Sequence, residues 1–207
     1  QPLPQAMSLS QSLRQKQKAA SRERILLAAS LRLRAQGLDG PAIGPVMKEA
    51  GLTHGAFTAH FKNKDELTRE AFRFAIAQKK PHWVRTEPAG FAAKLIRMAG
   101  EYLEPRHIDN PWEGCVIAAL ATEVTSARSD DFRQLYTDEM LQMILSIAEL
   151  ERPEDDPERY EQAIAFLAIC VGGISLAKNT RTRKQAITIL NACHEAVRKL
   201  NQTGTQY

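Results

Sequence analysis

The stretch of sequence that decides the fold is PVMKEAGLTHGAFTAHF, residues 45–61. Its pattern predicts two short helices joined through Ala50-Gly51-Leu52, where glycine lets the chain turn sharply. The side chains that can hold the two helices at a fixed angle are apolar: Val46, Ala50, Leu52, Phe57 and Phe61. Those left on the outer face are small or polar: His54, Gly55, Ala56, Thr58, Ala59 and His60. A helix that enters the major groove of DNA needs such a face, so the stretch indicates a helix-turn-helix, although the same arrangement also occurs as a purely structural unit.

Helical patterns surround this stretch. Together with the two short helices, the sequence predicts four helices in this part of the chain, over residues 22–36, 45–50, 53–61 and 65–80. Ser21 suits the N-cap of the first helix and Gly37 its end, while Gly44 and Pro45 suit the start of the second. Pro81 should end the fourth helix, because proline cannot continue the backbone hydrogen bonding. No stretch alternates between apolar and polar residues for long enough to predict a strand, so the expected fold class is all-α.

In order and spacing, residues 22–72 resemble the tetracycline-repressor (TetR) family. The matching positions are Arg22, Ile25, Leu26, Ala28, Ala29, Gly37, Val46, Ala50, Gly51, Leu52, Thr53, Gly55, Phe57, His60, Phe61, Lys64 and Leu67. The resemblance implies an N-terminal three-helix helix-turn-helix domain followed by a C-terminal helical bundle for ligand binding and dimerisation. The expected boundaries are residues 1–20 for a flexible basic arm, 21–68 for the DNA-binding domain and 69–207 for the effector-binding and dimerisation domain.

The resemblance also implies which residues meet DNA. Thr53, His60 and Lys64 would contact phosphates, although His60 could instead be a structural residue against Phe61. The residues nearest the base edges would be His54, Gly55, Ala56 and Ala59. Thr58 stands where the family usually has tyrosine, so that a threonine methyl could touch a thymine methyl instead. The basic residues Arg14, Lys16, Lys18 and Arg22 could follow the DNA backbone or form a solvated tail.

The distribution of charge supports a polyanionic partner for the N-terminal part. Residues 1–80 carry 14 Lys/Arg and 6 Asp/Glu, which leaves +8, whereas residues 81–207 carry 14 and 18, which leaves −4. The three cysteines form no CxxC pair and the five histidines show no metal-ligand spacing, so neither a disulfide framework nor a metal site is expected. No cofactor motif, nucleophile elbow or membrane span is expected either, and a cytoplasmic protein that is not an enzyme fits best.

The C-terminal part predicts helices over residues 89–103, 112–127, 131–150, 158–178 and 182–201, with Ser129 as the cap of the third. The last two helices are expected to pair with their copies in a homodimer, as a four-helix bundle. The residues expected at that interface are Phe166, Cys170, Ile174, Ala186, Leu190, Cys193, Val197 and Leu200. The alternative is that both faces are covered within one subunit.

Aromatic and sulfur-containing side chains between these two regions could line an effector pocket. They are Trp83, Met98, Tyr102, Trp112, Cys115, Phe132, Tyr136, Met140 and Phe166. Such residues at helical spacing also make ordinary core. Cys115 near the start of a helix could be a reactive sensor or a small buried residue.

The expected function is therefore that of a homodimeric repressor, which a small-molecule effector releases from a palindromic, inverted-repeat operator in double-stranded DNA. The alternative is a dimeric effector-binding adaptor of the same fold that has lost DNA binding.

Overall fold

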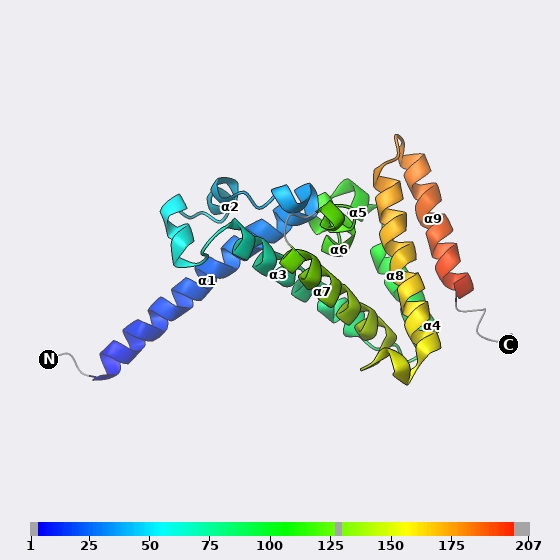
Figure 1. Cartoon of the computed structure of the whole chain (residues 1–207), viewed down its shortest axis with the longest axis horizontal. Coiled ribbons are helices and arrows are strands. Elements are labelled where there is room, and N and C mark those ends of the chain that lie inside the picture. Colours follow the sequence, from blue (N-terminus) through cyan, green and yellow to red (C-terminus); the bar gives the residue numbers. More distant parts are fainter. Residues whose placement is uncertain (1–3, 127–129, 201–207) are drawn as a thin grey trace. The chain divides into compact units, whose positions relative to one another are not determined.

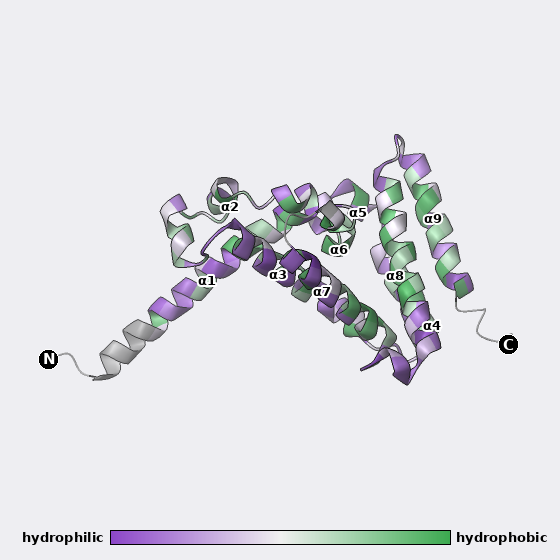
Figure 2. Cartoon of the chain, in the orientation of Figure 1, coloured by the Kyte–Doolittle hydropathy of each residue, from purple (hydrophilic) through white to green (hydrophobic). Residues whose placement is uncertain are grey.

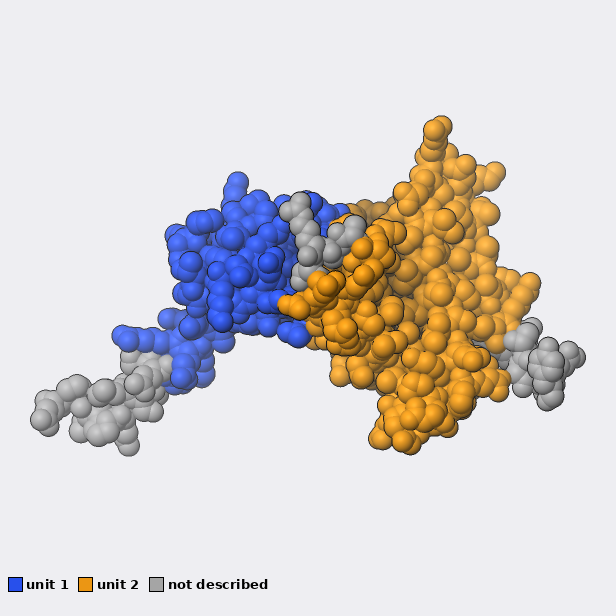
Figure 3. All heavy atoms as spheres, viewed as in Figure 1, with its two compact units in different colours: residues 1–75 blue, residues 76–207 orange. Residues whose placement is uncertain are grey.

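The computed structural model describes residues 4–126 and 130–200. The chain divides into two compact units, residues 1–75 (unit 1) and 76–207 (unit 2), which Figure 3 shows in different colours. Within the described ranges every regular element is a helix and none is a strand (Figure 1). The all-α class predicted from the sequence is confirmed.

Unit 1 contains the helix-turn-helix and the long first helix. Its elements are α1 (Pro4–Gln36), η1 (Gly37–Asp39), α2 (Ile43–Glu49), η2 (His54–Ala59) and the first part of α3 (Lys64–Val84). Residues 4–20, expected to form a flexible arm, continue α1, and Ser21 is an interior residue of that helix rather than its cap. Gly37 ends the helix as predicted, with a φ of 68° that suits glycine.

The starts and ends of two other helices differ from the prediction at proline. Helix α2 begins at Ile43 after Ala42, so Gly44 and Pro45 lie in its first turn, where the backbone N–H groups have no partner within the helix anyway. Helix α3 does not end at Pro81 but continues to Val84 with this proline inside it. Because proline has no N–H, the carbonyl of Ala77 receives no helical hydrogen bond from position 81.

Unit 2 is a bundle around α8. Its elements after α3 are α4 (Phe91–Tyr102), α5 (Arg106–Asp109), η3 (Pro111–Glu113), α6 (Val116–Leu120), η4 (Val124–Ser126), α7 (Asp130–Ala148), η5 (Pro153–Asp155), α8 (Pro157–Lys178) and α9 (Arg183–Leu200). Helix α8 contacts α4, α5, α6, α7 and α9. The single helix expected over residues 112–127 is wrong, because the chain is extended at Gly114 and Cys115 and only short helices flank them. The expected cap Ser129 lies outside the described residues.

The interface residues expected on α8 and α9 lie inside the subunit. Phe166, Cys170, Ile174, Ala186, Leu190 and Val197 are buried, and Cys193 and Leu200 are half-buried. Gly173 lets the two helices approach, since a Cβ at this position would lie 2.7 Å from Sγ of Cys193. The six buried side chains therefore lie in the interior of unit 2 and not on a surface open to a second subunit, whereas Cys193 and Leu200 keep part of their surface exposed.

Helix α8 carries hydrophobic residues along much of its length (Figure 2), and some of them are exposed. It is the one helix of the described ranges that is long and apolar enough to cross a membrane, a property that core helices of soluble proteins share, and 39% of its most apolar 18-residue window is buried. The side chains left outside at four-residue spacing are Ile164, Ala168 and Leu176, with Gly172 between them half-buried. Leu176 is 63% exposed, the highest value among the exposed large apolar residues.

A buried lysine ties three helices of unit 2 together. Nζ of Lys94 on α4 donates to the carbonyl of Ser146 (3.2 Å) and to Oε1 of Glu149 (3.0 Å), both near the end of α7. Arg159 of α8 donates to the other oxygen of Glu149 (2.6 Å). Burial lowers the pKa of Lys94, while the hydrogen bond to Glu149 opposes that shift. Glu149 has a φ of 59°, where glycine is usual, so the ion pairs hold a non-glycine residue in a left-handed conformation.

Candidate functional site

The turn between α2 and η2 has the geometry that the sequence predicted. Gly51 has a φ of 67°, a left-handed conformation that side chains disfavour. Hydrogen bonds close the turn on both sides, from the N–H of Gly51 to the carbonyl of Lys48 (3.1 Å) and from the N–H of Leu52 to that of Met47 (2.9 Å). The chain can therefore reverse within three residues, and this reversal sets the angle of η2 to α2.

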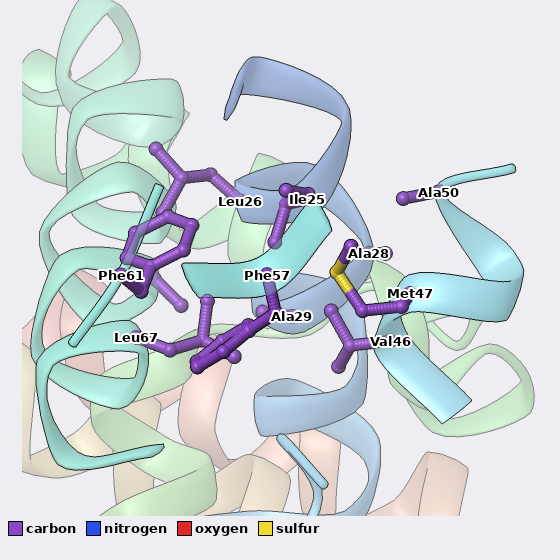
Figure 4. Close-up of a cluster of buried hydrophobic side chains, with 11 residues drawn as sticks. Ile25, Leu26, Ala28, Ala29, Val46, Met47, Ala50, Phe57, Phe61 and Leu67 are labelled. Carbon is purple, nitrogen blue, oxygen red and sulfur yellow. The ribbon is translucent and has the colours of Figure 1, made fainter. Parts of the chain in front are cut away.

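A buried cluster fixes the two short helices against α1 and α3 (Figure 4). It consists of Ile25, Leu26, Ala28, Ala29, Val46, Met47, Ala50, Phe57, Phe61, Leu67 and Ala71, with Leu52 packed against it. The rings of Phe57 and Phe61 stack with centroids 5.8 Å apart. The five apolar residues predicted to pin the helices thus do so, and Phe57 anchors η2 from its centre.

The opposite face of η2 is open. Thr53, His54, Gly55, Thr58 and Ala59 are exposed, and Ala56 and His60 are half-buried. The element is a six-residue 3₁₀-helix, shorter than the helix over residues 53–61 that the sequence predicted. Thr58 forms a long hydrogen bond within the element, from its Oγ1 to the carbonyl of Gly55 (3.4 Å). Small side chains with hydroxyl and imidazole groups therefore form a narrow, accessible surface.

His60 sits at the edge of this surface among cations. Its ring packs against Phe61 with centroids 6.4 Å apart, and Nδ1 is buried without a hydrogen-bond partner in the described ranges. Burial lowers the pKa of His60, and the positive charges of Lys18 and Arg22 lower it further. His60 is thus both packed against the core, as one reading of the sequence expected, and placed where α1 brings positive charge.

Arg22 belongs to the folded unit rather than to a free arm. Its guanidinium lies 5.0 Å from the centroid of the Phe61 ring and donates to Glu70 of α3 (3.0 Å). Arg14, Lys16 and Lys18 precede it on the exposed N-terminal part of α1. These cations therefore stand on a helix instead of a flexible tail.

Lys64 opens α3 beside η2. Asn63 caps the helix, since its Oδ1 accepts from the N–H of Glu66 (2.9 Å), and Glu66 in turn accepts from the N–H of Lys62 (2.6 Å). The ammonium of Lys64 is partly exposed and lies 3.8 Å from Oδ1 of Asp39. The start of α3 thus holds a lysine close to the N–H groups of a helix N-terminus, which favours an anion.

Unit 2 contains a cavity of about 810 Å³, the open mouth included. Five of the nine expected pocket residues line it: Trp83, Met98, Tyr102, Cys115 and Phe166. The other four do not. Trp112 is exposed, Phe132 and Tyr136 are buried elsewhere in the unit, and Met140 is half-buried. Tyr136 is held away by a hydrogen bond from its hydroxyl to the carbonyl of Ile117 (2.9 Å).

The other lining residues are not among those nine. The apolar ones are Met143, Ile147, Leu167, Cys170 and Ile174, and the polar ones are Lys79, His82, Glu101, Arg106, His107 and Glu113. Several polar ones come from short or irregular segments, such as α5, which carry no helical periodicity. Nδ1 of His107 donates to the carbonyl of Tyr102 (2.7 Å), and burial lowers the pKa of His107. No group of three or more His, Cys, Asp or Glu that could hold a metal occurs within residues 4–126 and 130–200.

Three solved structures share this architecture over most of their length. A TetR transcriptional regulator from Chloroflexus aurantiacus J-10-FL has a TM-score of 0.69 and 20% sequence identity, over 91% of this chain and 97% of that one. A TetR-family regulator from Cytophaga hutchinsonii has a TM-score of 0.67 and 16% identity, over 87% and 94%. The reduced form of E. coli NemR has a TM-score of 0.68 and 17% identity, over 86% and 95%. No family model and no curated protein sequence matches the chain. By its architecture, the chain has the fold of the TetR-family transcriptional regulators.

Proposed function

We propose that the chain is a homodimeric transcriptional repressor that binds an inverted repeat in double-stranded DNA and is released by a small-molecule effector. The observation that carries the proposal is the outer face of η2, whose small and polar side chains are held outward by the buried Phe57 and Phe61. A helix with this surface can approach base edges in a major groove. The solved structures of similar fold are described as transcriptional regulators, which agrees with it.

In this proposal the residues divide into two roles. Thr53, His60 and Lys64 contact phosphates, and the start of α3 adds its N–H groups. The residues that meet base edges are His54, Gly55, Ala56, Thr58 and Ala59. The cations on α1 add a sequence-independent attraction that salt weakens.

The dimer forms through the outer side of α8 instead of its inner side. Ile164, Ala168 and Leu176 repeat every four or eight residues and leave an apolar stripe on the surface. Leu176→Arg should convert the dimer to monomer in analytical ultracentrifugation. The matched control is Leu141→Arg on α7, since Leu141 is a similarly exposed leucine, at 39%. An unchanged dimer in the Leu176 variant would contradict this interface.

Binding of effector and operator would oppose each other. Helix α3 carries Lys64 at its start, and Lys79, His82 and Trp83 of the same helix line the cavity. A ligand that favours a different conformation of the cavity can therefore act on α3. The coupling is reciprocal and is expected to change each affinity by roughly 5- to 150-fold.

Fluorescence anisotropy with labelled DNA from the region that flanks the chain's own gene tests the DNA-binding proposal. We expect saturable binding by a dimer, and Lys64→Ala should weaken all sequences alike and lower the salt slope by about 1. Lys80→Ala is the matched control, because Lys80 is an exposed lysine of the same helix in unit 2. A folded sample without salt-sensitive binding to any DNA would favour the adaptor that has lost DNA binding.

A further inference from the structure

The cavity of unit 2 has an apolar interior with one polar atom that the protein itself leaves unused. Met98, Met143 and Phe166 are buried around it, and Trp83 is 8% exposed. The hydroxyl oxygen of Tyr102 lies beside the Cys115 thiol, is shielded from solvent and has no hydrogen-bond partner in the described ranges. A buried hydroxyl without a partner is costly, so a ligand that supplies one gains most of a hydrogen bond.

The Tyr102 hydroxyl acts as a donor. Burial raises the pKa of Tyr102 well above its ordinary value, so the phenol keeps its hydrogen at neutral pH. Burial likewise raises the pKa of the neighbouring Cys170 thiol, which is neutral as well. The interior therefore favours an acceptor atom, and a single neutral donor offsets little of the cost of burying an anion.

Two of the charged residues that line the cavity, Glu101 and Arg106, are paired with residues that do not line it. Glu101 accepts from Arg97 (3.0 Å), and Arg106 pairs with Glu104 (2.8 Å). The lowered pKa of His107 leaves its ring uncharged near neutral pH. A ligand with a net charge would have to compete with these pairs, whereas an uncharged ligand would not.

We infer that the cavity binds an uncharged aromatic molecule that places a hydrogen-bond acceptor, a carbonyl oxygen or its equivalent, against the hydroxyl of Tyr102. This inference rests on the proposed function, because it takes the cavity to be the effector site. The aromatic class follows from the rings of Trp83 and Phe166 and from the two methionines, whose flexible thioethers adapt to flat ligands. Tyr102 is then the residue that selects among ligands of the same shape.

Equilibrium dialysis with two probes of matched shape tests the inference. The probes are 2-acetylnaphthalene, which has a carbonyl oxygen, and 2-isopropenylnaphthalene, which has a CH₂ group in its place. The unmodified chain should bind the acetyl compound about tenfold more tightly. In Tyr102→Phe that preference should vanish, because the acetyl compound loses affinity while the isopropenyl compound keeps it.

Tyr136→Phe is the matched control. It removes another buried tyrosine hydroxyl of unit 2, but one that donates to Ile117 and does not line the cavity, so the tenfold preference should remain. Retained binding of the isopropenyl probe shows that Tyr102→Phe is folded. No preference in the unmodified chain, no binding of either probe, or an equal preference in Tyr102→Phe would overturn the inference.

The same samples separate this inference from the proposed function. DNA binding is measured by anisotropy in samples that contain no probe. If the chain binds DNA but does not prefer the acetyl probe, only the inference about the ligand is refuted. If the chain prefers the acetyl probe but does not bind DNA, only the proposal of a DNA-binding regulator is refuted.

Discussion

The ammonium nitrogen of Lys64 lies 3.8 Å from a carboxylate oxygen of Asp39, which is itself fully exposed. Asp39 ends η1, and Lys64 begins α3, so the pair joins two segments that flank the helix-turn-helix. The same lysine is the proposed phosphate contact. Asp39 therefore pairs with the positive charge of Lys64 and also repels the phosphate that would take the place of Asp39 beside this lysine.

Asp39→Asn should strengthen DNA binding. Solvent screens an exposed carboxylate strongly, so its removal should lower the Kd by no more than about fivefold at low salt. Anisotropy titrations measure the change. The gain should be absent when Lys64→Ala is also present, and a gain of equal size in both backgrounds would show that Asp39 acts by another route.

The turn of the helix-turn-helix offers a test with two glycines. Gly51→Ala must adopt a φ of 67°, and although no neighbour lies closer than 3.8 Å, the strain should cost about 1–2 kcal/mol. Gly55→Ala has open space around its Cβ and ordinary backbone, so its unfolding midpoint should not fall. Its DNA affinity should fall instead, since the added methyl faces the proposed base edges. Thermal unfolding and anisotropy on both variants check this, and equal behaviour of the two glycine variants would contradict a structural role for Gly51 and a contact role for Gly55.

The helix-turn-helix could be predicted from sequence because its constraints are local. The positive φ of Gly51 and the burial of Phe57 and Phe61 depend on residues within a few positions or on a periodic apolar pattern. Helix ends were less predictable. Ser21 is a good N-cap and Pro81 a good stop in isolation, but α1 and α3 continue through both. Local preferences of about 1 kcal/mol at a cap give way to the surrounding helix and its packing.

The ion pairs around Lys94 predict an asymmetry between two neutral substitutions. Lys94→Met removes a fully buried charge, and Glu149 keeps its ion pair with Arg159. The free energy of unfolding should therefore change little or rise. Glu149→Gln leaves Lys94 charged and buried, and should cost about 2 kcal/mol, reduced by the 32% exposure of the Glu149 side chain. Denaturant unfolding measures both. The reverse order would show that Lys94, not Glu149, holds the three helices together.

DNA affinity should depend on pH through His60. In the free protein, burial and then Lys18 and Arg22 lower its pKa, so protonation opposes folding, and stability falls as pH drops through the ordinary value of 6.5. A phosphate beside the ring raises the pKa in the complex, so protons are taken up on binding, and DNA affinity should rise as pH falls through the same range. Anisotropy across this range tests it. His60→Gln should flatten the dependence, whereas His107→Gln, which removes a histidine of lowered pKa in unit 2, should leave it unchanged.

The cavity could be predicted only in part. Trp83, Met98, Tyr102, Cys115 and Phe166 were found because bulky side chains at helical spacing tend to line interiors. Phe132 and Tyr136 share that spacing but face other parts of the core, and the direction of a face is set by contacts between helices that no local pattern contains. For the same reason the apolar residues of α8 and α9 were recognised but were expected to contact a second subunit. The close approach of Gly173 to Cys193 shows that these two helices contact each other within one chain.

Pro81 gives α3 a weak point between Lys79 and the other two residues of this helix that line the cavity, His82 and Trp83. The turn that contains His82 and Trp83 is attached to the preceding helix with one hydrogen bond fewer, so it can bend without unwinding residues 64–80. A small ligand that displaces Trp83 would move only this last turn of α3. Only a larger ligand, which displaces the last turn further than it can bend, would move the rest of the helix. The size of a bound compound would then decide, separately from its affinity, whether it moves α3.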